Sequence, residues 1–198
     1  MAFLRSTYDT DVRPLAEGGA VTLRPPQIGD YAAWAALREA SREHLVPWEP
    51  TWGPDELSRA SYKQRLRHYV QEAREGTGYA FFLARASDGA LLGGLSLSNV
   101  RRGVTQSASI GYWIGAPYAR QGYMTAGVRA ALPFVFDFLS LHRLDAACLP
   151  SNAASIAVLE RNGFHREGMA RSYLKINGKW QDHLLFARLA DRPYRQRV

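Results

Sequence analysis

The first third of the chain predicts a short strand followed by two helices. Apolar and polar residues alternate at the start of Val21–Pro26, a strand that two prolines end, and an amphipathic helical pattern follows from about Ile28 to Ala40. A second helix is expected from Pro54 to about Glu75. Between the helices, the segment HLVPWEPTW at His44–Trp52 is rich in aromatic residues and proline, and it predicts a loop.

The remaining two thirds predict strands interleaved with two further helices. A hairpin is expected from strands Tyr79–Ala86 and Leu91–Leu97, joined by the turn sequence Ser87–Asp88–Gly89, and a second hairpin turns at Asn177–Gly178. The other expected elements are a strand at 107–114, a helix that begins at 121–125, a strand at 143–149, a helix at 152–162, and hairpin strands at 168–176 and 179–189. This order indicates an α/β (α+β) fold, with helices on both faces of a mixed, mostly antiparallel sheet.

Residues 107–125 couple an alternating strand to a turn that opens a helix. One face of the strand carries Ala108, Ile110, Tyr112 and Ile114, and the other carries Ser107, Ser109, Gly111 and Trp113. The chain then turns at Pro117, so the backbone amides around 121–125 are expected to lie unpaired at a helix N-terminus, where they attract phosphate. The alternative is that Gly122 serves only as a tight turn between strand and helix.

The helix that follows this turn contains a conflict. Its apolar stripe is Val128, Leu132, Val135 and Leu139, which follows helical spacing. Pro133 falls in the third turn, where the missing backbone bond costs of order 3 kcal/mol. A kink is therefore expected there.

A second motif lies downstream. The segment PSNAASIAVLERNGFHREG at Pro150–Gly168 places Asn152 and Ser155 one turn apart, at the start of a helix that ends at Asn162–Gly163. Together with IGYWI, QGYMT, HLVPWEPTW and the closing YLKINGKWQDH, it resembles the GNAT superfamily of acyl-CoA-dependent N-acetyltransferases, and within it the ribosomal-protein-alanine N-acetyltransferases. The resemblance covers nearly the whole chain. It implies one GNAT-like domain over 1–198, with a cofactor-binding core at about 79–189, an acceptor-side loop at about 44–53 and a short basic tail at 191–198.

The resemblance implies acetyl-CoA as the acyl donor, with coenzyme A as product. It implies that the pantetheine arm follows the strand backbone at Tyr112, Trp113 and Ile114, and that the pyrophosphate lies on the amides of Arg120, Gln121, Gly122, Tyr123, Met124 and Thr125. In the second motif, Asn152 is expected to contact the arm, and Ser155 to lie near the sulfur, where its hydroxyl can protonate the thiolate. The alternative is that Ser151 or Asn152 is only a helix N-cap.

Four positions depart from the family pattern. Arg120 stands where a glycine is frequent, and Ala126 where a glutamate is frequent. Leu159 replaces the tyrosine with which many GNAT enzymes protonate the thiolate, and Leu174 replaces a glutamate that some ribosomal-protein acetyltransferases carry. These departures leave Ser155 or water as the acid. They also leave open a non-catalytic acyl-CoA-binding module.

The general base has three candidates, Glu49, Asp182 and His183, with Tyr173 as an orienting group. Neighbours on a strand point to opposite faces, so at most one of Asp182 and His183 faces the cleft. An α-amine, with a pKa near 7.7–8, pays roughly 1–1.5 kcal/mol to become neutral at pH 7, whereas a lysine amine pays about 4.6 kcal/mol. A site without a strong base therefore suits a protein N-terminus better than a lysine.

The loop His44–Trp52 is the candidate acceptor site. Trp48 and Trp52 lie between prolines and can form an aromatic wall, while Glu49 can attract an ammonium group. Alternatively, both tryptophans anchor the loop in the core. We therefore expect an acetyl-CoA-dependent N-acetyltransferase that modifies the N-terminal α-amine of a protein, such as a ribosomal protein, by direct attack. The closest alternative is a small-molecule amine: an amino acid, a polyamine or an antibiotic.

Composition narrows this picture. The 198 residues suffice for one domain with a full core. The net charge of +7 and pI near 9.8 would suit a polyanion, but the basic residues are spread out, so no sequence-specific nucleic-acid site is expected. Cys148, the only cysteine, is expected to be buried and inert, and no metal site is predicted. No signal peptide or membrane span is evident, which predicts a cytoplasmic protein, either a monomer or a homodimer.

Overall fold

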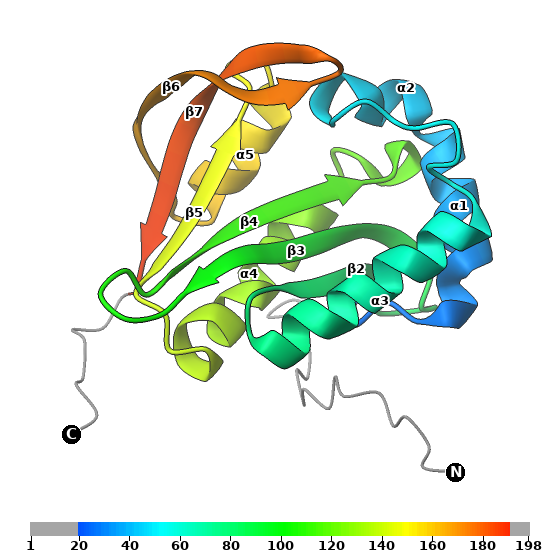
Figure 1. The fold of residues 1–198 in the computed structure, drawn as a ribbon, viewed down its shortest axis with the longest axis horizontal. Coiled ribbons are helices and arrows are strands. Elements are labelled where there is room, and N and C mark those ends of the chain that lie inside the picture. Colours follow the sequence, from blue (N-terminus) through cyan, green and yellow to red (C-terminus); the bar gives the residue numbers. More distant parts are fainter. Residues whose placement is uncertain (1–19, 191–198) are drawn as a thin grey trace.

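One sheet organises the fold (Figure 1). The structure is a computed structural model that describes residues 20–190, so the expected basic tail at 191–198 and the N-terminal segment that was searched for a signal peptide lie outside the described residues. Within that range, seven strands pair in the order β1-β2-β3-β4-β5-β7-β6. They are β1 (Val21–Arg24), β2 (Tyr79–Arg85), β3 (Leu91–Arg101), β4 (Ser107–Ile114), β5 (Arg143–Cys148), β6 (His165–Ile176) and β7 (Lys179–Leu189).

The sheet is split between β4 and β5. All other neighbouring strands are antiparallel, whereas β4 and β5 are parallel and pair only from Ser107 to Ser109, opposite Arg143–Asp145. Beyond that point the two strands spread apart (Figure 1). On its other edge, β4 pairs with β3 as far as Ile114. Among the strands of residues 20–190, therefore, none pairs with the β5-facing edge of residues 110–114.

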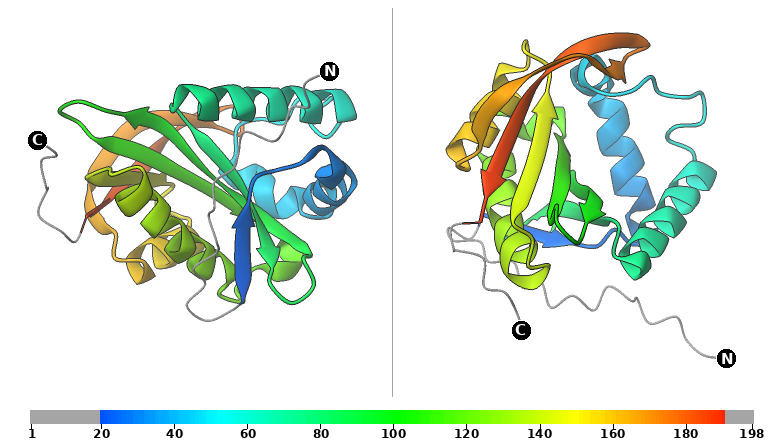
Figure 2. Two further views of the ribbon diagram at one scale, coloured as in Figure 1. Left: turned by 90° about the horizontal axis from the view of Figure 1, so that it is seen from below. Right: turned by 60° about the vertical axis from the view of Figure 1, so that its left-hand side comes forward.

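Helices cover both faces of the sheet (Figure 2). On one face lie α1 (Tyr31–Ala40) and α3 (Arg59–Glu75); on the other lie α4 (Tyr123–Pro133) and α5 (Ala153–Arg161). The alternation of β2 accounts for both layers. Phe81 and Leu83 join the main core with Val128 of α4, whereas Phe82 packs with Trp34 and Tyr62 of the α1–α3 layer. The expected fold class, a mostly antiparallel sheet with helices on both faces, is confirmed.

Several predicted boundaries are wrong. The second helix begins at Arg59 rather than Pro54, because the Ser58 hydroxyl caps it by accepting a bond from the Ser61 amide at 3.1 Å. The first helical segment opens as a 3-10 turn at Ile28–Asp30 before α1. Strand β3 continues past the predicted Leu97 after an irregularity in its pairing, and β6 begins at 165 rather than 168.

Pro133 changes the type of helix. The α-helical pattern ends at this residue, and Phe134–Phe138 form a π-helical turn in which the Leu139 amide bonds the Phe134 carbonyl, five residues back, at 2.9 Å. Proline cannot donate a backbone bond and its ring crowds the preceding turn, so local widening of the helix accommodates it. A kink was expected at Pro133, and the structure shows a change from α-helix to π-helix at this residue.

Candidate active site

Strand β4 and helix α5 meet at the split in the sheet. The Tyr112 hydroxyl crosses from β4 and lies 2.9 Å from the Ser155 Oγ and 3.3 Å from the Ser155 carbonyl oxygen. Ser155 occupies the first turn of α5, where its amide donates to the Asn152 side-chain oxygen at 3.0 Å. Asn152 is thus the N-cap of α5, and the cap fixes the helix end that presents Ser155.

Cys148 closes this cluster from the end of β5. Burial raises the pKa of both the Tyr112 phenol and the Cys148 thiol, and hydrogen bonding to Ser155 offsets only part of each shift. Both groups are therefore protonated at neutral pH. A thiol is a weak nucleophile compared with its thiolate, so the geometry favours direct transfer over an acyl-cysteine route.

The N-terminus of α4 and the turn before it, residues 120–125, form a cradle of backbone amides. The first α-helical backbone bond runs from the Ala126 amide to the Gly122 carbonyl at 3.0 Å, so the amides of residues 123–125 have no intrahelical acceptor. Gly122 has a φ of 81°, and a Cβ built on it would meet nothing within 4 Å. Open space, free amides and a helix N-terminus together suit a diphosphate.

Arg120 adopts a conformation that glycine prefers. Its φ is 61°, in the left-handed region that L-residues enter at a cost of about 1–2 kcal/mol. That conformation explains why a glycine is frequent at this position. The arginine retains the turn geometry of a glycine, so this departure from the family pattern leaves the cradle intact.

A cavity of about 500 Å³ lies on the opposite face of the sheet, beneath α1 and α3. Its lining includes the β4 residues Gly111, Tyr112 and Trp113, so β4 borders the cavity and the split alike. Gly94 makes room for the Trp113 indole, since a Cβ at that position would lie 2.6 Å from the Trp113 Nε1. The cavity therefore reaches the strand that carries Tyr112.

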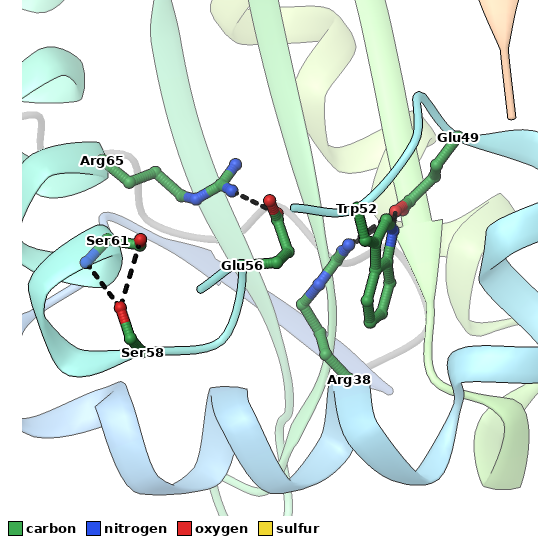
Figure 3. A network of polar contacts seen from close by, with 7 residues as sticks. All are labelled: Arg38, Glu49, Trp52, Glu56, Ser58, Ser61 and Arg65. Atoms are coloured by element: carbon green, nitrogen blue, oxygen red, sulfur yellow. Dashed lines mark hydrogen bonds and ion pairs between the residues drawn. The ribbon is translucent and has the colours of Figure 1, made fainter. Parts of the chain in front are cut away.

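An ion pair occupies one side of the cavity (Figure 3). The Arg38 guanidinium contacts both carboxylate oxygens of Glu49, at 3.2 and 2.5 Å, and the Trp52 indole N–H donates to Glu49 at 2.7 Å. Arg38 also stacks 4.5 Å from the Trp52 ring centroid and 5.0 Å from that of Trp113. With three donors on one carboxylate, Glu49 anchors the loop onto α1.

A second pair balances the charge on the other side. Arg65 of α3 contacts Glu56 at 2.6 Å (Figure 3). The charged residues in the cavity lining are therefore two arginines and two glutamates, each arginine paired with one carboxylate. Aromatic side chains, among them Trp34, Trp52 and Trp113, form much of the remaining wall. The cavity is aromatic and electrically balanced rather than acidic.

Comparison with known proteins identifies the family. Residues 20–165 match the family model described as an acetyltransferase (GNAT) domain. The chain belongs to the GNAT acetyltransferase family. It is 33% identical over 173 residues to the probable N-acetyltransferase YjcK of Bacillus subtilis (strain 168), covering 87% of this chain and 96% of that protein.

Two further relatives are informative. One is named for its acceptor protein, and the other was solved with a bound form of coenzyme A. The [ribosomal protein uS5]-alanine N-acetyltransferase of Escherichia coli (strain K12) is 32% identical over 162 residues, covering 81% of this chain and 84% of the relative. Mycobacterium smegmatis RimJ, solved in complex with CoA-disulfide, is 38% identical with a TM-score of 0.83, covering 87% of this chain and 83% of RimJ. The expected resemblance is confirmed, and the GNAT chain is an N-acetyltransferase.

The structure brings together most of the residues expected to bind the donor. Tyr112, Trp113 and Ile114 form the open end of β4, and Arg120 to Thr125 form the cradle. Asn152 and Ser155 lie at the head of α5. Leu159 is fully buried in the core, whereas Leu174 is exposed on β6, so neither position offers an acid or a base.

Only some of the residues expected on the acceptor side line the cavity. Glu49 and Trp52 line the cavity, whereas Trp48 is partly exposed and does not. Asp182 accepts a bond from the Ser172 amide at 2.8 Å, and so stabilises an irregularity in β6. Leu184, two residues after Asp182 and on the same face of β7, joins the main core. His183 lies between them and therefore points to the opposite face, as expected.

His183 is buried, but it is not among the residues that line the cavity. Its Nδ1 lies 3.0 Å from the Gln181 carbonyl oxygen, which can only accept, so Nδ1 is the donor of this hydrogen bond. The Tyr173 ring lies 5.8 Å away, edge-on. These positions are compatible with the roles predicted for His183 as a base and Tyr173 as an orienting group, which stay predictions.

Sequence reasoning missed Arg38 and Arg65, which supply the positive charges of the cavity. A signal for Arg38 exists. It lies one turn after Trp34 and one turn before Ser41, on the face of α1 that the structure buries. An arginine on a buried helical stripe needs a carboxylate or aromatic partner, and this one has both.

Two general features complete the description. Among residues 20–190, no His, Cys, Asp and Glu side chains gather in a group of three or more that could hold a metal ion. Within the same residues, no helix combines the length and apolar character needed to cross a bilayer.

Proposed function

We propose that this GNAT enzyme transfers the acetyl group of acetyl-CoA to the N-terminal α-amine of a protein, and that a ribosomal protein is the natural acceptor. The charge-balanced aromatic cavity beside β4 carries the proposal. A pocket for polyamines or cationic antibiotics would need excess carboxylates to attract several ammonium groups, and here each carboxylate is already paired with an arginine. The E. coli relative, named for the alanine of ribosomal protein uS5, supports the acceptor class.

The donor site follows from the chain itself. Acetyl-CoA supplies an activated acetyl thioester. The amides of residues 121–125 would hold its pyrophosphate, with Gly122 allowing close approach. The unpaired edge of β4 at residues 110–114 offers backbone donors and acceptors to the amide groups of the pantetheine arm. Ser155, which contacts Tyr112 at the split, would donate a hydrogen bond to the leaving sulfur.

The acceptor would approach from the other face of β4. Direct attack requires a neutral amine, and a protein N-terminus reaches that state at pH 7 for roughly 1–1.5 kcal/mol. The group that takes the proton would be one of the three predicted candidates, Glu49, Asp182 or His183, or water. The aromatic walls of the cavity would hold the first side chains of the peptide.

The test is CoA release from acetyl-CoA against a panel of amines. The panel contains peptides with free Ala or Ser N-termini, the same peptides N-blocked but carrying a lysine, and small polyamines. We expect turnover with the free N-termini alone. Turnover of polyamines alone would replace the proposal with a small-amine acetyltransferase, and turnover of blocked peptides would make lysine the acceptor.

A further inference from the structure

We infer that Tyr112 is a positioning residue whose hydroxyl donates to Ser155 and thereby directs the Ser155 proton toward the leaving sulfur. The inference rests on the proposed role of Ser155 within the acetyl-transfer function. It concerns a side chain that the sequence motifs assigned only a backbone role. The Tyr112 Oη lies 2.9 Å from the Ser155 Oγ, a normal O–H···O hydrogen bond that crosses the split between β4 and α5.

The burial of the pair supports a fixed geometry. The Tyr112 ring packs against the main core with Ile156 of α5, so the hydroxyl has little freedom to turn away. Ser155 is held from its other side, because its amide donates to the Asn152 cap. Two independent contacts thus fix the serine, one through its backbone and one through its side chain.

The direction of the hydrogen bond follows from counting protons. Each hydroxyl has one proton to donate. If Ser155 donated to Tyr112, its only proton would be used and nothing on α5 could face a developing thiolate. If Tyr112 donates, the Ser155 proton is left for the sulfur atoms that face it, the neutral Cys148 thiol and then the thiolate of the leaving group, whose charge makes it the stronger acceptor. The longer contact with the Ser155 carbonyl, at 3.3 Å, competes poorly, because that oxygen also accepts the helical bond of α5.

No proton needs to leave Tyr112. As the amine attacks, the bond between the acyl carbon and sulfur breaks and its electron pair stays on sulfur. The Ser155 hydroxyl then donates to that charge, and the Tyr112 hydroxyl supports Ser155 in a chain of two hydrogen bonds. The proton lost by the amine later reaches the thiolate or solvent. Burial raises the pKa of Tyr112, which keeps the phenol a donor throughout.

The contact between Tyr112 and Ser155 also bears on the leucine, rather than tyrosine, at position 159. That side chain is only 1% exposed and lies within the core, so a phenol at its position would have to displace packed side chains. In this chain the phenol at the split comes from β4 instead of α5. It reaches the sulfur through Ser155 rather than directly.

The first experiment measures binding and needs no acceptor. Affinities for CoA and for desulfo-CoA, in which hydrogen replaces the thiol, are compared by calorimetry in the wild type, Tyr112→Phe, Ser155→Ala and the double variant. We expect the wild type to favour CoA by about 3–10-fold, and all three variants to lose that preference to the same extent. A preference retained in Tyr112→Phe would overturn the inference, as would separate, additive losses.

The second experiment measures turnover on whichever acceptor the panel identifies. Tyr112→Phe is expected to lower kcat about five- to tenfold with an unchanged KM for acetyl-CoA, and to have no further effect in the Ser155→Ala background. Tyr79→Phe is the matched control, a core-packed tyrosine on β2 that is expected to leave kcat unchanged. Equal losses in both backgrounds would refute positioning. If no peptide is acetylated, the acceptor proposal fails while the binding experiment still decides the role of Tyr112.

Discussion

Gly122 offers a test of the diphosphate site with a matched control inside the same chain. Gly122 and Gly103 both have positive φ, 81° and 66°, and a Cβ on either would meet nothing within 4 Å. Replacement by alanine therefore adds backbone strain and no clash, at about 1–2 kcal/mol for each. For a chain of this size the melting temperature should fall by roughly 2–8 °C in both variants.

Of the two substitutions, only Gly122→Ala should lower the affinity for acetyl-CoA. Gly103 lies in the turn between β3 and β4, at the opposite end of β4 from the cradle. A Cβ at Gly122 would keep the diphosphate from close approach, and losing one charge-assisted bond costs about 1.5–3 kcal/mol, or roughly 10–150-fold in affinity. Calorimetric titration measures this directly. Equal acetyl-CoA affinities in Gly122→Ala and Gly103→Ala would refute the placement of the diphosphate at the α4 N-terminus.

Three further outcomes test the structure. Glu49→Ala should destabilise the fold by about 3 kcal/mol or more in urea unfolding, because it leaves Arg38, only 8% exposed, without its counter-charge; a loss below about 1 kcal/mol would show that solvent screens the pair. Cys148 should resist iodoacetamide at pH 7.5 until urea is added, since burial raises its pKa; rapid labelling of the native protein would contradict this. Leu159→Ala should cost about 2–5 kcal/mol of stability while acetyl-CoA affinity is retained; weakened binding at unchanged stability would assign Leu159 to the site.

Local pattern predicted the backbone geometry of the proposed donor site more fully than the side-chain contacts of the cavity. A strand followed by a turn and a helix places its amides by backbone geometry alone, so Gly122 and the residues after it could be located from the sequence. Asn152 and Ser155 follow similarly from a helix start and its cap. The split between β4 and β5 could not be derived from local pattern, because it depends on how far two distant strands pair.

The acceptor half depends on tertiary partners. Glu49 was predicted as a base or an ammonium site. Its partner Arg38 lies eleven residues earlier, and helical spacing shows that Arg38 shares a face with Trp34 but does not show which carboxylate it meets. The helix boundary near Arg59 moved for a related reason, since the capping hydroxyl of Ser58 outweighs the proline that suggested an earlier start. A tertiary ion pair decides the first case and a local side-chain cap decides the second, and the periodicity of apolar residues shows neither.

Under the proposed function, the alternation of β4 would let one strand serve both substrates. Tyr112 points toward α5 and contacts Ser155, the group proposed to face the leaving sulfur, and its neighbour Trp113 points toward α1 and forms a wall of the cavity. Their Cα atoms are one residue apart, about 3.8 Å. A shift of one residue in the pairing of β4 with β3 would exchange the two side chains and place the indole at Ser155. Gly94, opposite Trp113, leaves space for the indole in the observed register, so this strand pairing holds Trp113 in the cavity wall.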